Sequence, residues 1–348
     1  MNVSTRNLGL VLFVLQIVTT GCGDGAPPPA TSVPSTEDTT TTEAAALGCP
    51  TPFIGTGDHD VVITHEGRAH TFHVHVPAGV RASTRVPVVF SFHGGFGTAD
   101  GAEQTAGLVP FSDANGFVLV RPEGSPATSG QVWNAGSCCG AAAETDQAVD
   151  HVGAVRVFLD TLQTQLCVDK KRVFATGHSN GGMFSYRLAC ELSDRIAAIA
   201  SNAAYLMNRD LSVLPARTLF TCAPSRPVPV LHMHGLADGC APINGGVSGL
   251  DPAIRPTARY GVDLFRVNNG CGATPTTTYS QGTASCSTWS GCSAGADVTY
   301  CTEGGAGHVW PGSTRYPAAT RTQCGGDVTS DLQANTMLWN FFTTHPMP

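Results

Sequence analysis

Lysine is almost absent from this chain of 348 residues, which has only Lys170 and Lys171. Lysine and arginine together number 19 against 26 acidic residues, and the formal net charge is −7. A chain this poor in basic groups lacks the positive surface that nucleic-acid binding needs, so no nucleic-acid partner is expected. Apolar runs of about 18 residues, the length that a membrane-spanning helix requires, are also missing.

Cysteine pairs of the C-x-x-C type, which mark many metal and redox sites, do not occur among the 13 cysteines. Such a large number of cysteines indicates an oxidising compartment, in which disulfides persist. We expect the adjacent Cys138 and Cys139 to bond to two separate partners and not to each other.

The histidine pairs at His73–His75 and His232–His234 each place two rings on one face of a strand, but no carboxylate stands nearby at a familiar spacing. The sequence therefore predicts neither a metal nor a cofactor.

The first 21 residues have the features of a signal peptide. Arg6 supplies a positive charge, Leu8–Val18 is largely apolar, and Thr19–Gly21 are small. The glycine directly before Cys22 resembles the lipobox of bacterial lipoproteins, in which the cysteine carries a lipid. We therefore expect residues 1–21 to be a lipoprotein-type signal peptide and Cys22 to be lipidated. Ordinary secretion and a retained membrane anchor are the alternatives.

Residues 22–48 predict a disordered tether, because they are mostly proline, threonine, serine, alanine, glycine and acidic residues, which cannot bury a face. The remaining residues 49–348 show no repeat and no second linker, so they predict one domain. Short apolar strands that alternate with helices indicate an α/β fold with a mostly parallel sheet and helices on both faces. We expect a disulfide-rich monomer.

The expected strands are ranges rich in β-branched or apolar residues, namely 60–64, 70–76, 86–92, 117–120, 172–176, 228–233 and 298–301. The expected helices are 145–166, 181–192, 253–267 and 332–342. Ser330 is the expected N-cap of the last helix. Residues 269–327 are rich in cysteine, glycine, threonine and serine, and predict a loop-rich excursion.

Gly177–Gly181 matches the G-x-S-x-G pattern of a nucleophile elbow, with Ser179 at its centre. A second match occurs around Ser293. An elbow needs a strand before the serine and a helix after it, because the serine takes a strained turn. Ser179 lies between a predicted strand and a predicted helix, whereas Ser293 precedes a strand. We therefore predict that Ser179 is the nucleophile and that Ser293 is a loop serine.

A serine nucleophile needs a histidine base that a carboxylate orients, and in the α/β-hydrolase arrangement the chain order is serine, acid, histidine. Only His308 and His345 lie beyond residue 238, and nothing in the terminal sequence would hold the ring of His345. His308 follows a strand and a glycine-rich segment, so we predict that it is the base. Asp238 follows the strand at 228–233 and is the predicted acid. The alternative acids are Asp251, Asp263 and Asp297.

The negative charge that develops on an ester oxygen must be met by preorganised backbone N–H groups. The residue after the nucleophile, Asn180, supplies one of them. The second is expected in the glycine-rich segment after the strand at 86–92. Gly95 is the preferred donor there and Phe96 is the alternative, while a tight turn without this role is the other interpretation.

Several segments of this chain resemble a family of extracellular serine esterases that comprises polyhydroxybutyrate depolymerases and related feruloyl esterases. The resemblance spans about residues 60 to 343 and rests on Gly177–Met183, Tyr186–Cys190, Trp133-Asn134 followed by Cys138-Cys139-Gly140, His234-Gly235 followed by Asp238 and Pro242, Asn244–Gly246, and Gly307–Gly312. It implies an α/β-hydrolase fold and a triad of serine, aspartate and histidine. It also suggests that Trp133 and Trp310 form an aromatic wall of the acyl pocket, with core packing as the alternative for each.

These features predict an exported serine esterase that forms an acyl-enzyme, outside the cell or at its surface. The expected substrate is a polyester of the poly(3-hydroxybutyrate) type, and the alternative is a feruloyl or acetyl ester on plant polysaccharide. Contact with a membrane is expected only through the N-terminal lipid. A non-catalytic binding lipoprotein on a hydrolase scaffold is the alternative from another functional class.

Overall fold

The computed structural model describes residues 48–127, 129–139, 149–248 and 254–348. The expected signal peptide, Cys22 and all but the last residue of the expected tether lie outside the described residues, as does Asp251. Within the described ranges, no helix is both long and apolar enough to cross a membrane.

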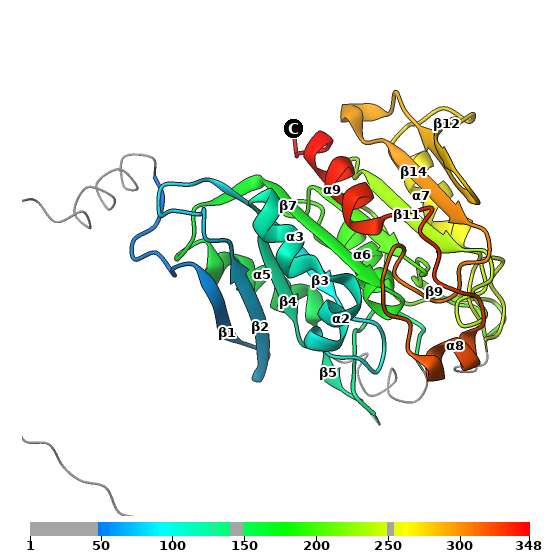
Figure 1. Ribbon diagram of the computed structural model, residues 1–348, viewed down its shortest axis with the longest axis horizontal. Coiled ribbons are helices and arrows are strands. Elements are labelled where there is room, and N and C mark those ends of the chain that lie inside the picture. The colour runs from blue at the N-terminus through cyan, green and yellow to red at the C-terminus, as the bar shows by residue number, and fades with distance from the viewer. Residues whose placement is uncertain (1–47, 128, 140–148, 249–253) are drawn as a thin grey trace, which may run out of the picture.

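A ten-stranded sheet forms the centre of the protein (Figure 1). Its strands are, along the chain, β1 (Gly57–His65), β2 (Arg68–Val76), β3 (Val86–Phe92), β4 (Val118–Pro122), β7 (Val168–His178), β8 (Ala198–Asn202), β11 (Val230–Gly235), β12 (Thr276–Gln281), β13 (Ala284–Trp289) and β14 (Val298–Glu303). Two small two-stranded sheets are formed by β5 (Ser125–Pro126) with β6 (Gln131–Val132) and by β9 (Arg209–Asp210) with β10 (Arg217–Thr218).

The middle of the large sheet is parallel and its two edges are antiparallel. The strand order is β1-β2-β4-β3-β7-β8-β11-β14-β13-β12. All pairs from β4 to β14 in this order are parallel, whereas β1, β2, β12 and β13 pair in antiparallel fashion. Every residue of β3, β8 and β11 is buried, as expected for strands covered on both faces. The predicted α/β class with a mostly parallel sheet is confirmed.

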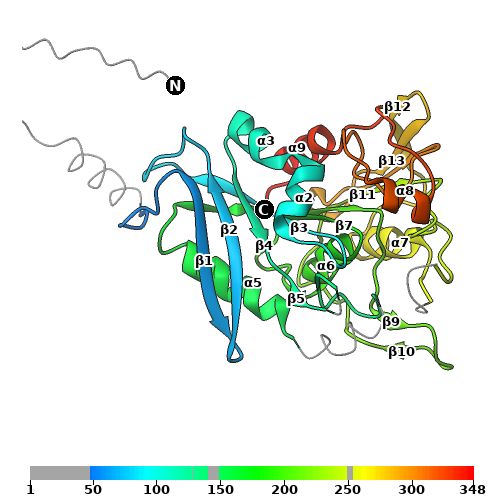
Figure 2. The same ribbon diagram turned by 60° about the horizontal axis from the view of Figure 1, so that its bottom comes forward.

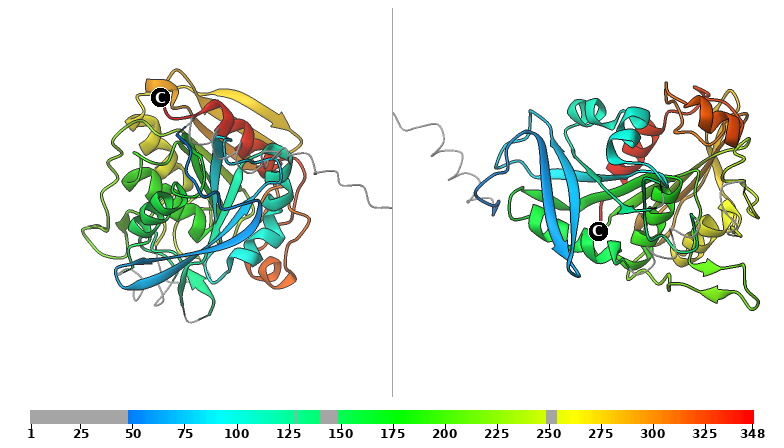
Figure 3. Two further views of the ribbon diagram at one scale, coloured as in Figure 1. Left: turned by 90° about the vertical axis from the view of Figure 1, so that its left-hand side faces the viewer. Right: turned by 90° about the horizontal axis from the view of Figure 1, so that it is seen from below.

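Helices cover both faces of the sheet. They are α2 (Ala99–Ala106), α3 (Leu108–Asn115), α5 (His151–Leu162), α6 (Asn180–Glu191), α7 (Ala258–Asn268), α8 (Ala318–Cys324) and α9 (Ala334–Thr344). The helices α2, α3 and α9 lie on one face, and α5, α6 and α7 lie on the other (Figures 2 and 3). Figure 3 shows the two layers from below. Two apolar cores result, one built around α5 and α6 and the other around α3 and α9.

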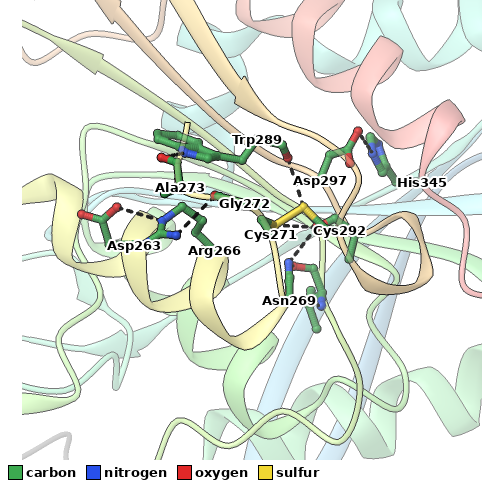
Figure 4. Close-up of a disulfide and its surroundings, with 12 residues drawn as sticks. Asp263, Arg266, Asn269, Cys271, Gly272, Ala273, Trp289, Cys292, Asp297 and His345 are labelled. Atoms are coloured by element: carbon green, nitrogen blue, oxygen red, sulfur yellow. Dashed lines mark hydrogen bonds and ion pairs between the residues drawn. A yellow bond between two sulfur atoms is a disulfide. The ribbon is translucent and has the colours of Figure 1, made fainter. Parts of the chain in front are cut away.

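The segment 269–327 differs from its prediction as a loop-rich excursion. It contributes β12, β13 and β14 to the large sheet, and α8 follows them. The disulfide Cys271–Cys292 closes the start of this segment, where Asn269 donates hydrogen bonds to two backbone carbonyls (Figure 4). The prediction that Ser330 caps the last helix was also wrong, because α9 begins at Ala334 with Gln333 at the N-cap.

All the cysteines of the described residues are paired in six disulfides. They are Cys49–Cys167, Cys138–Cys139, Cys190–Cys222, Cys240–Cys324, Cys271–Cys292 and Cys286–Cys301. The expectation that Cys138 and Cys139 bond to separate partners was wrong, because these neighbours bond to each other. Spacing along the chain carries no information on which cysteines meet in space. Six disulfides fit an oxidising compartment.

A histidine on β2 links the edge of the sheet to α3. Nδ1 of His75 lies 2.9 Å from Oδ1 of Asp58, and its Nε2 lies 3.0 Å from Oδ1 of Asp113. Burial would lower the pKa of His75, but the hydrogen bonds with Asp113 and Asp58 raise it above its ordinary value. A raised pKa in the folded state stabilises the fold below the unfolded pKa of about 6.5, and this stabilisation is lost as the pH rises through the raised value.

We therefore expect His75→Gln to lower the free energy of unfolding by about 1 kcal/mol near pH 5.5, because both carboxylates are well exposed, and by much less near pH 8.5. Urea unfolding at the two pH values measures the difference. His59→Gln is the matched control on β1, since Nε2 of His59 has no hydrogen-bond partner among the described residues. An equal loss at both pH values would contradict the proposed role of the charged ring.

Candidate active site

Ser179 lies on a sharp turn between β7 and α6. Its backbone has φ 55° and ψ −122°, a conformation that a residue with a β-carbon rarely adopts. The turn is tight because its glycines touch backbone: a Cβ on Gly177 would lie 2.5 Å from the carbonyl carbon of Gly181, and one on Gly181 would lie 2.2 Å from the oxygen of Phe92. Only glycine fits at these two positions, which is the physical reason for the pattern around Ser179.

Ser293 has a different setting. It begins the exposed 3-10 turn Ser293–Gly295, and the next element of the chain is the strand β14. Its backbone N–H donates to the carbonyl of Asn269 at 2.8 Å. Ser293 is thus a loop residue, in agreement with its sequence-based interpretation.

Asp238 and His308 meet at the carboxyl end of the parallel sheet. Asp238 follows β11 and His308 follows the neighbouring strand β14, so both lie at the edge where β7 leads into Ser179. Nδ1 of His308 lies 2.7 Å from Oδ2 of Asp238. The ring centroid of His308 lies 4.5 Å from that of His178, the residue directly before Ser179. The structure therefore places the pair of Asp238 and His308 beside the turn that carries Ser179.

The carboxylate of Asp238 has no exposed surface and accepts several hydrogen bonds. Its Oδ1 accepts from the backbone N–H groups of Cys240 at 2.9 Å and Ala241 at 2.7 Å. Burial would raise the pKa of Asp238, but the charge and hydrogen bond of His308 oppose this and hold it below its ordinary value. An ionised Asp238 keeps a proton on Nδ1 of His308, which leaves Nε2 free to act as a base.

The loop that carries Asp238 is fastened from two sides. Cys240 is bonded to Cys324, the last residue of α8, and the N–H of Gly239 donates to the carbonyl of Cys324 at 2.7 Å. On the other side, the N–H of Ala237 donates to the carbonyl of Ala306 in the His308 loop at 2.9 Å. These contacts fix the acid and the base relative to each other.

The predicted pair His232–His234 lies in a buried hydrogen-bonded chain behind Asp238. Nε2 of His234 donates to the carbonyl of Ala241 at 2.7 Å, so its Nδ1 accepts from Nε2 of His232 at 3.0 Å. Nδ1 of His232 in turn accepts from the hydroxyl of Tyr186 at 2.9 Å. Burial lowers the pKa of both histidines, so both rings are neutral. This chain supports the Asp238 loop.

Asn202, the last residue of β8, positions the groups around Ser179. Its Nδ2 donates to the carbonyl of Val309 at 2.9 Å and to Nδ1 of His178 at 2.8 Å. Burial, followed by the charge of His308, lowers the pKa of His178 to about 3, so this ring is neutral with its proton on Nε2. Asn202 was not among the predicted residues. A polar residue that ends an apolar strand is the sequence signal that points to it.

The rejected candidates Asp297 and His345 pair with each other, with 3.7 Å between Oδ2 and Nε2 (Figure 4). Asp297 directly precedes β14, whereas His308 follows it, so this pair lies at the opposite end of the strand. Nδ1 of His345 also lies 2.7 Å from the carbonyl of Phe341, so the expectation that nothing holds its ring was wrong. Asp263 lies on α7, as expected for a residue outside the site.

The glycine-rich segment after β3 forms a tight turn. The carbonyl of Gly94 accepts hydrogen bonds from Nδ1 of His93 at 2.8 Å and from the N–H of Gly97 at 3.1 Å. Nε2 of His93 accepts from a backbone N–H, which places its proton on Nδ1. The peptide between Gly94 and Gly95 is trans, so the N–H of Gly95 points in the opposite direction to the carbonyl of Gly94. It therefore points away from the two groups that donate to this carbonyl.

The two candidate donors in this turn differ in availability. The N–H of Phe96 donates to the carbonyl of Gln131 at 2.6 Å and is therefore occupied. A Cβ on Gly95 would lie 3.4 Å from Cβ of Asn180, so Gly95 lies next to the turn of Ser179. Asn180 is the first residue of α6, where a backbone N–H has no partner within the helix. This geometry favours Gly95 and Asn180 as the oxyanion donors.

A cavity of about 290 Å³ lies beside His308 and the glycine turn, and Trp310 forms part of its wall. Trp133 does not line it. Trp133 is 4% exposed, and its ring stacks on Phe184 with 5.3 Å between centroids and donates from Nε1 to the carbonyl of His93. The placement of Trp133 therefore fits core packing behind the turn and not an acyl-pocket wall.

One group of metal-ligating side chains occurs within the described ranges, with the donor atoms of His65, Glu66 and Asp150 within 4.8 Å of one another. His65 and Asp150 already bond to each other at 2.9 Å. Asp150 also caps α5 by accepting from the N–H of Gly153 at 2.9 Å. These contacts explain the cluster without a metal, and we assign none to it.

The chain is similar to known esterases over most of its length. Over 241 residues it is 30% identical to "Feruloyl esterase B" of Piromyces equi, which covers 68% of this chain but only 42% of that protein. Over 335 residues it is 31% identical to "Putative esterase NocK" of Nocardia uniformis subsp. tsuyamanensis, which covers 89% of this chain and 91% of that protein. No protein-family model matches the chain.

Among solved structures, the acetyl xylan esterase from Aspergillus awamori matches with a TM-score of 0.57 and 13% identity, over 83% of this chain and 99% of that one. At such low identity this match shows the fold alone, which is the α/β-hydrolase fold that the resemblance implied. The match to the Nocardia protein, in contrast, covers nearly the full length of both chains at higher identity. The chain belongs to the feruloyl esterase-like family of carboxylic ester hydrolases.

Proposed function

We propose that this protein is an exported serine esterase that cleaves feruloyl or acetyl esters on plant polysaccharide through an acyl-enzyme. The observation that carries the mechanism is the hydrogen bond of 2.7 Å between Asp238 and His308 beside the elbow of Ser179. Nucleophilic attack on an ester requires a serine, a histidine that takes the serine's proton, and a carboxylate that orients the histidine.

In the proposed mechanism, Oγ of Ser179 attacks the ester carbonyl while Nε2 of His308 takes its proton. The negative oxygen of the tetrahedral intermediate accepts hydrogen bonds from the backbone N–H groups of Gly95 and Asn180. His308 then gives its proton to the leaving alcohol, and the acyl group stays on Ser179. A water molecule, deprotonated by His308, releases the acid. Asp238 keeps the ring oriented and stabilises its positive charge.

The substrate class is supported by names and by the cavity. The feruloyl esterase name of the Piromyces relative described above favours esters of plant polysaccharide over the polyester that the sequence first suggested. The cavity of about 290 Å³ next to His308 is lined in part by the aromatic residues Phe92, Trp310 and Tyr316. An aromatic or acetyl group of modest size suits such a space.

Parallel assays on methyl ferulate, acetylated xylan and polyhydroxybutyrate film test this proposal. We expect turnover of methyl ferulate or acetylated xylan at a rate at least about tenfold above release from the film, because a pocket discriminates by differential transition-state binding. Faster hydrolysis of the film would reinstate the polyester as substrate. Absence of any turnover above that of Ser179→Ala would favour a non-catalytic binding protein instead.

Export is supported by the six disulfides, which persist in oxidising compartments. Lipidation at Cys22 stays a prediction from the sequence. A lipid at that position, followed by the tether, would place the esterase at the cell surface and within reach of polymeric substrate.

A further inference from the structure

The disulfide between Cys138 and Cys139 packs directly on Gly95, one of the two proposed oxyanion donors. Sγ of Cys139 lies 3.1 Å from the position that a Cβ would occupy on Gly95. The same position on Gly95 lies 3.4 Å from Cβ of Asn180, so Gly95 is close to both the disulfide and the start of α6. Both cysteines are buried, with 4% and 7% of their surfaces exposed.

The disulfide lies at the end of a segment, residues 131–139, that we call the strap. The strap is bound to the glycine turn, because the carbonyl of Gln131 accepts the N–H of Phe96 at 2.6 Å. It is also bound to α6, because the side chain of Asn180 accepts from the N–H of Trp133 at 2.7 Å and donates to its carbonyl at 3.2 Å. The strap therefore joins the two segments that supply the proposed donors.

The backbone of Cys139 has an unfavourable conformation. Its φ is 71°, in the left-handed region that a β-carbon disfavours. The strap is anchored just before it at Gly136, where a Cβ would lie 1.9 Å from the carbonyl oxygen of Met207. With Gly136 anchored and Cys139 bonded to Cys138, Sγ of Cys139 stays against Gly95.

We propose that the Cys138–Cys139 disulfide is a positioning element of the oxyanion hole. It holds the N–H groups of Gly95 and Asn180 where charge develops on the ester oxygen. This inference rests on the proposed esterase function. Donors stabilise that charge only when they are preorganised, so a wall that keeps Gly95 from moving acts on the transition state more than on the bound substrate.

The experiment uses two variants of the full chain, Cys138→Ser/Cys139→Ser and Cys138→Ser/Cys139→Gly. The second accepts the left-handed backbone at position 139 without strain, so it preserves folding. Cys286→Ser/Cys301→Ser is the matched control, because it removes a buried disulfide that joins β13 to β14, away from the glycine turn. We measure kcat and KM for p-nitrophenyl acetate, the affinity for a boronic acid that forms a tetrahedral serine adduct, and the Tm of each protein.

Both strap variants are expected to lose about 10- to 100-fold in kcat and a similar factor in boronic acid affinity, with KM within about twofold of the wild type. The control variant is expected to lose Tm but to keep kcat. Strap variants with wild-type kcat, or a control with the same loss of kcat, would overturn the inference. If Ser179→Ala hydrolyses the ester as fast as the wild type, this result would instead overturn the proposed function itself.

Discussion

Ser179→Ala is expected to lower kcat for p-nitrophenyl acetate by about 10⁴-fold or more. Without the hydroxyl no acyl-enzyme can form, and the residual rate comes only from binding and the oxyanion donors. The side chain of Ser179 accepts no helix-capping hydrogen bond, so its removal leaves α6 intact. Stopped-flow or steady-state absorbance at saturating substrate, together with an unchanged Tm, measures this effect.

Ser293→Ala is the control, because Ser293 has the same G-x-S-x-G neighbours but lies in an exposed turn. Its kcat should equal that of the wild type. Comparable activity in Ser179→Ala and the wild type would show that ester cleavage occurs elsewhere or that the protein is not an esterase. A loss in Ser293→Ala instead would identify the second match as the nucleophile.

Asp238→Asn is expected to lower kcat by roughly 10⁴-fold while KM changes little. Oδ1 of Asp238 accepts two backbone N–H groups, so the amide oxygen of an asparagine takes that side. The amide nitrogen then faces Nδ1 of His308, which must accept instead of donate. The proton of His308 then lies on Nε2, so this nitrogen can no longer accept the proton of Ser179.

The matched control is Asp263→Asn on α7, a half-exposed carboxylate that pairs with Arg259. It should leave kcat unchanged. Because the pKa of Asp238 is held below its ordinary value, the carboxylate stays charged above its unfolded pKa, and the stability that it contributes is lost only as the pH falls through the lowered value. Full activity of Asp238→Asn at neutral pH would exclude Asp238 as the orienting acid.

The centre of the sheet could be predicted from the sequence because local and global signals agree there. Val86–Phe92 is a nearly continuous apolar run, and β3 has the same bounds. Residues 173–177 of β7, before Ser179, and all of β11, before Asp238, are likewise buried, which makes them visible as short apolar segments. The order of the site residues along the chain then follows from the order of the parallel strands.

The antiparallel edge formed by β12 and β13 could not be predicted in the same way. The strand β12 consists mainly of exposed threonine, serine and glutamine, and β13 has few apolar residues, so neither has an apolar signal. These strands exist because they pair with β14, which is a tertiary cause. The preference for Gly95 over Phe96 has a tertiary cause too, since it depends on a hydrogen bond from Phe96 to the distant Gln131.

The disulfide between Cys49 and Cys167 has a mechanical consequence. Cys49 precedes the edge strand β1, while Cys167 directly precedes β7 in the middle of the sheet. A tensile load on the chain before residue 49 would otherwise reach β1 first and could peel this edge strand away one hydrogen bond at a time. The covalent bond diverts that load into β7, a strand with neighbours on both sides. An enzyme tethered by its N-terminus to a surface while bound to an insoluble polymer would thus bear the pull on a central strand of its sheet.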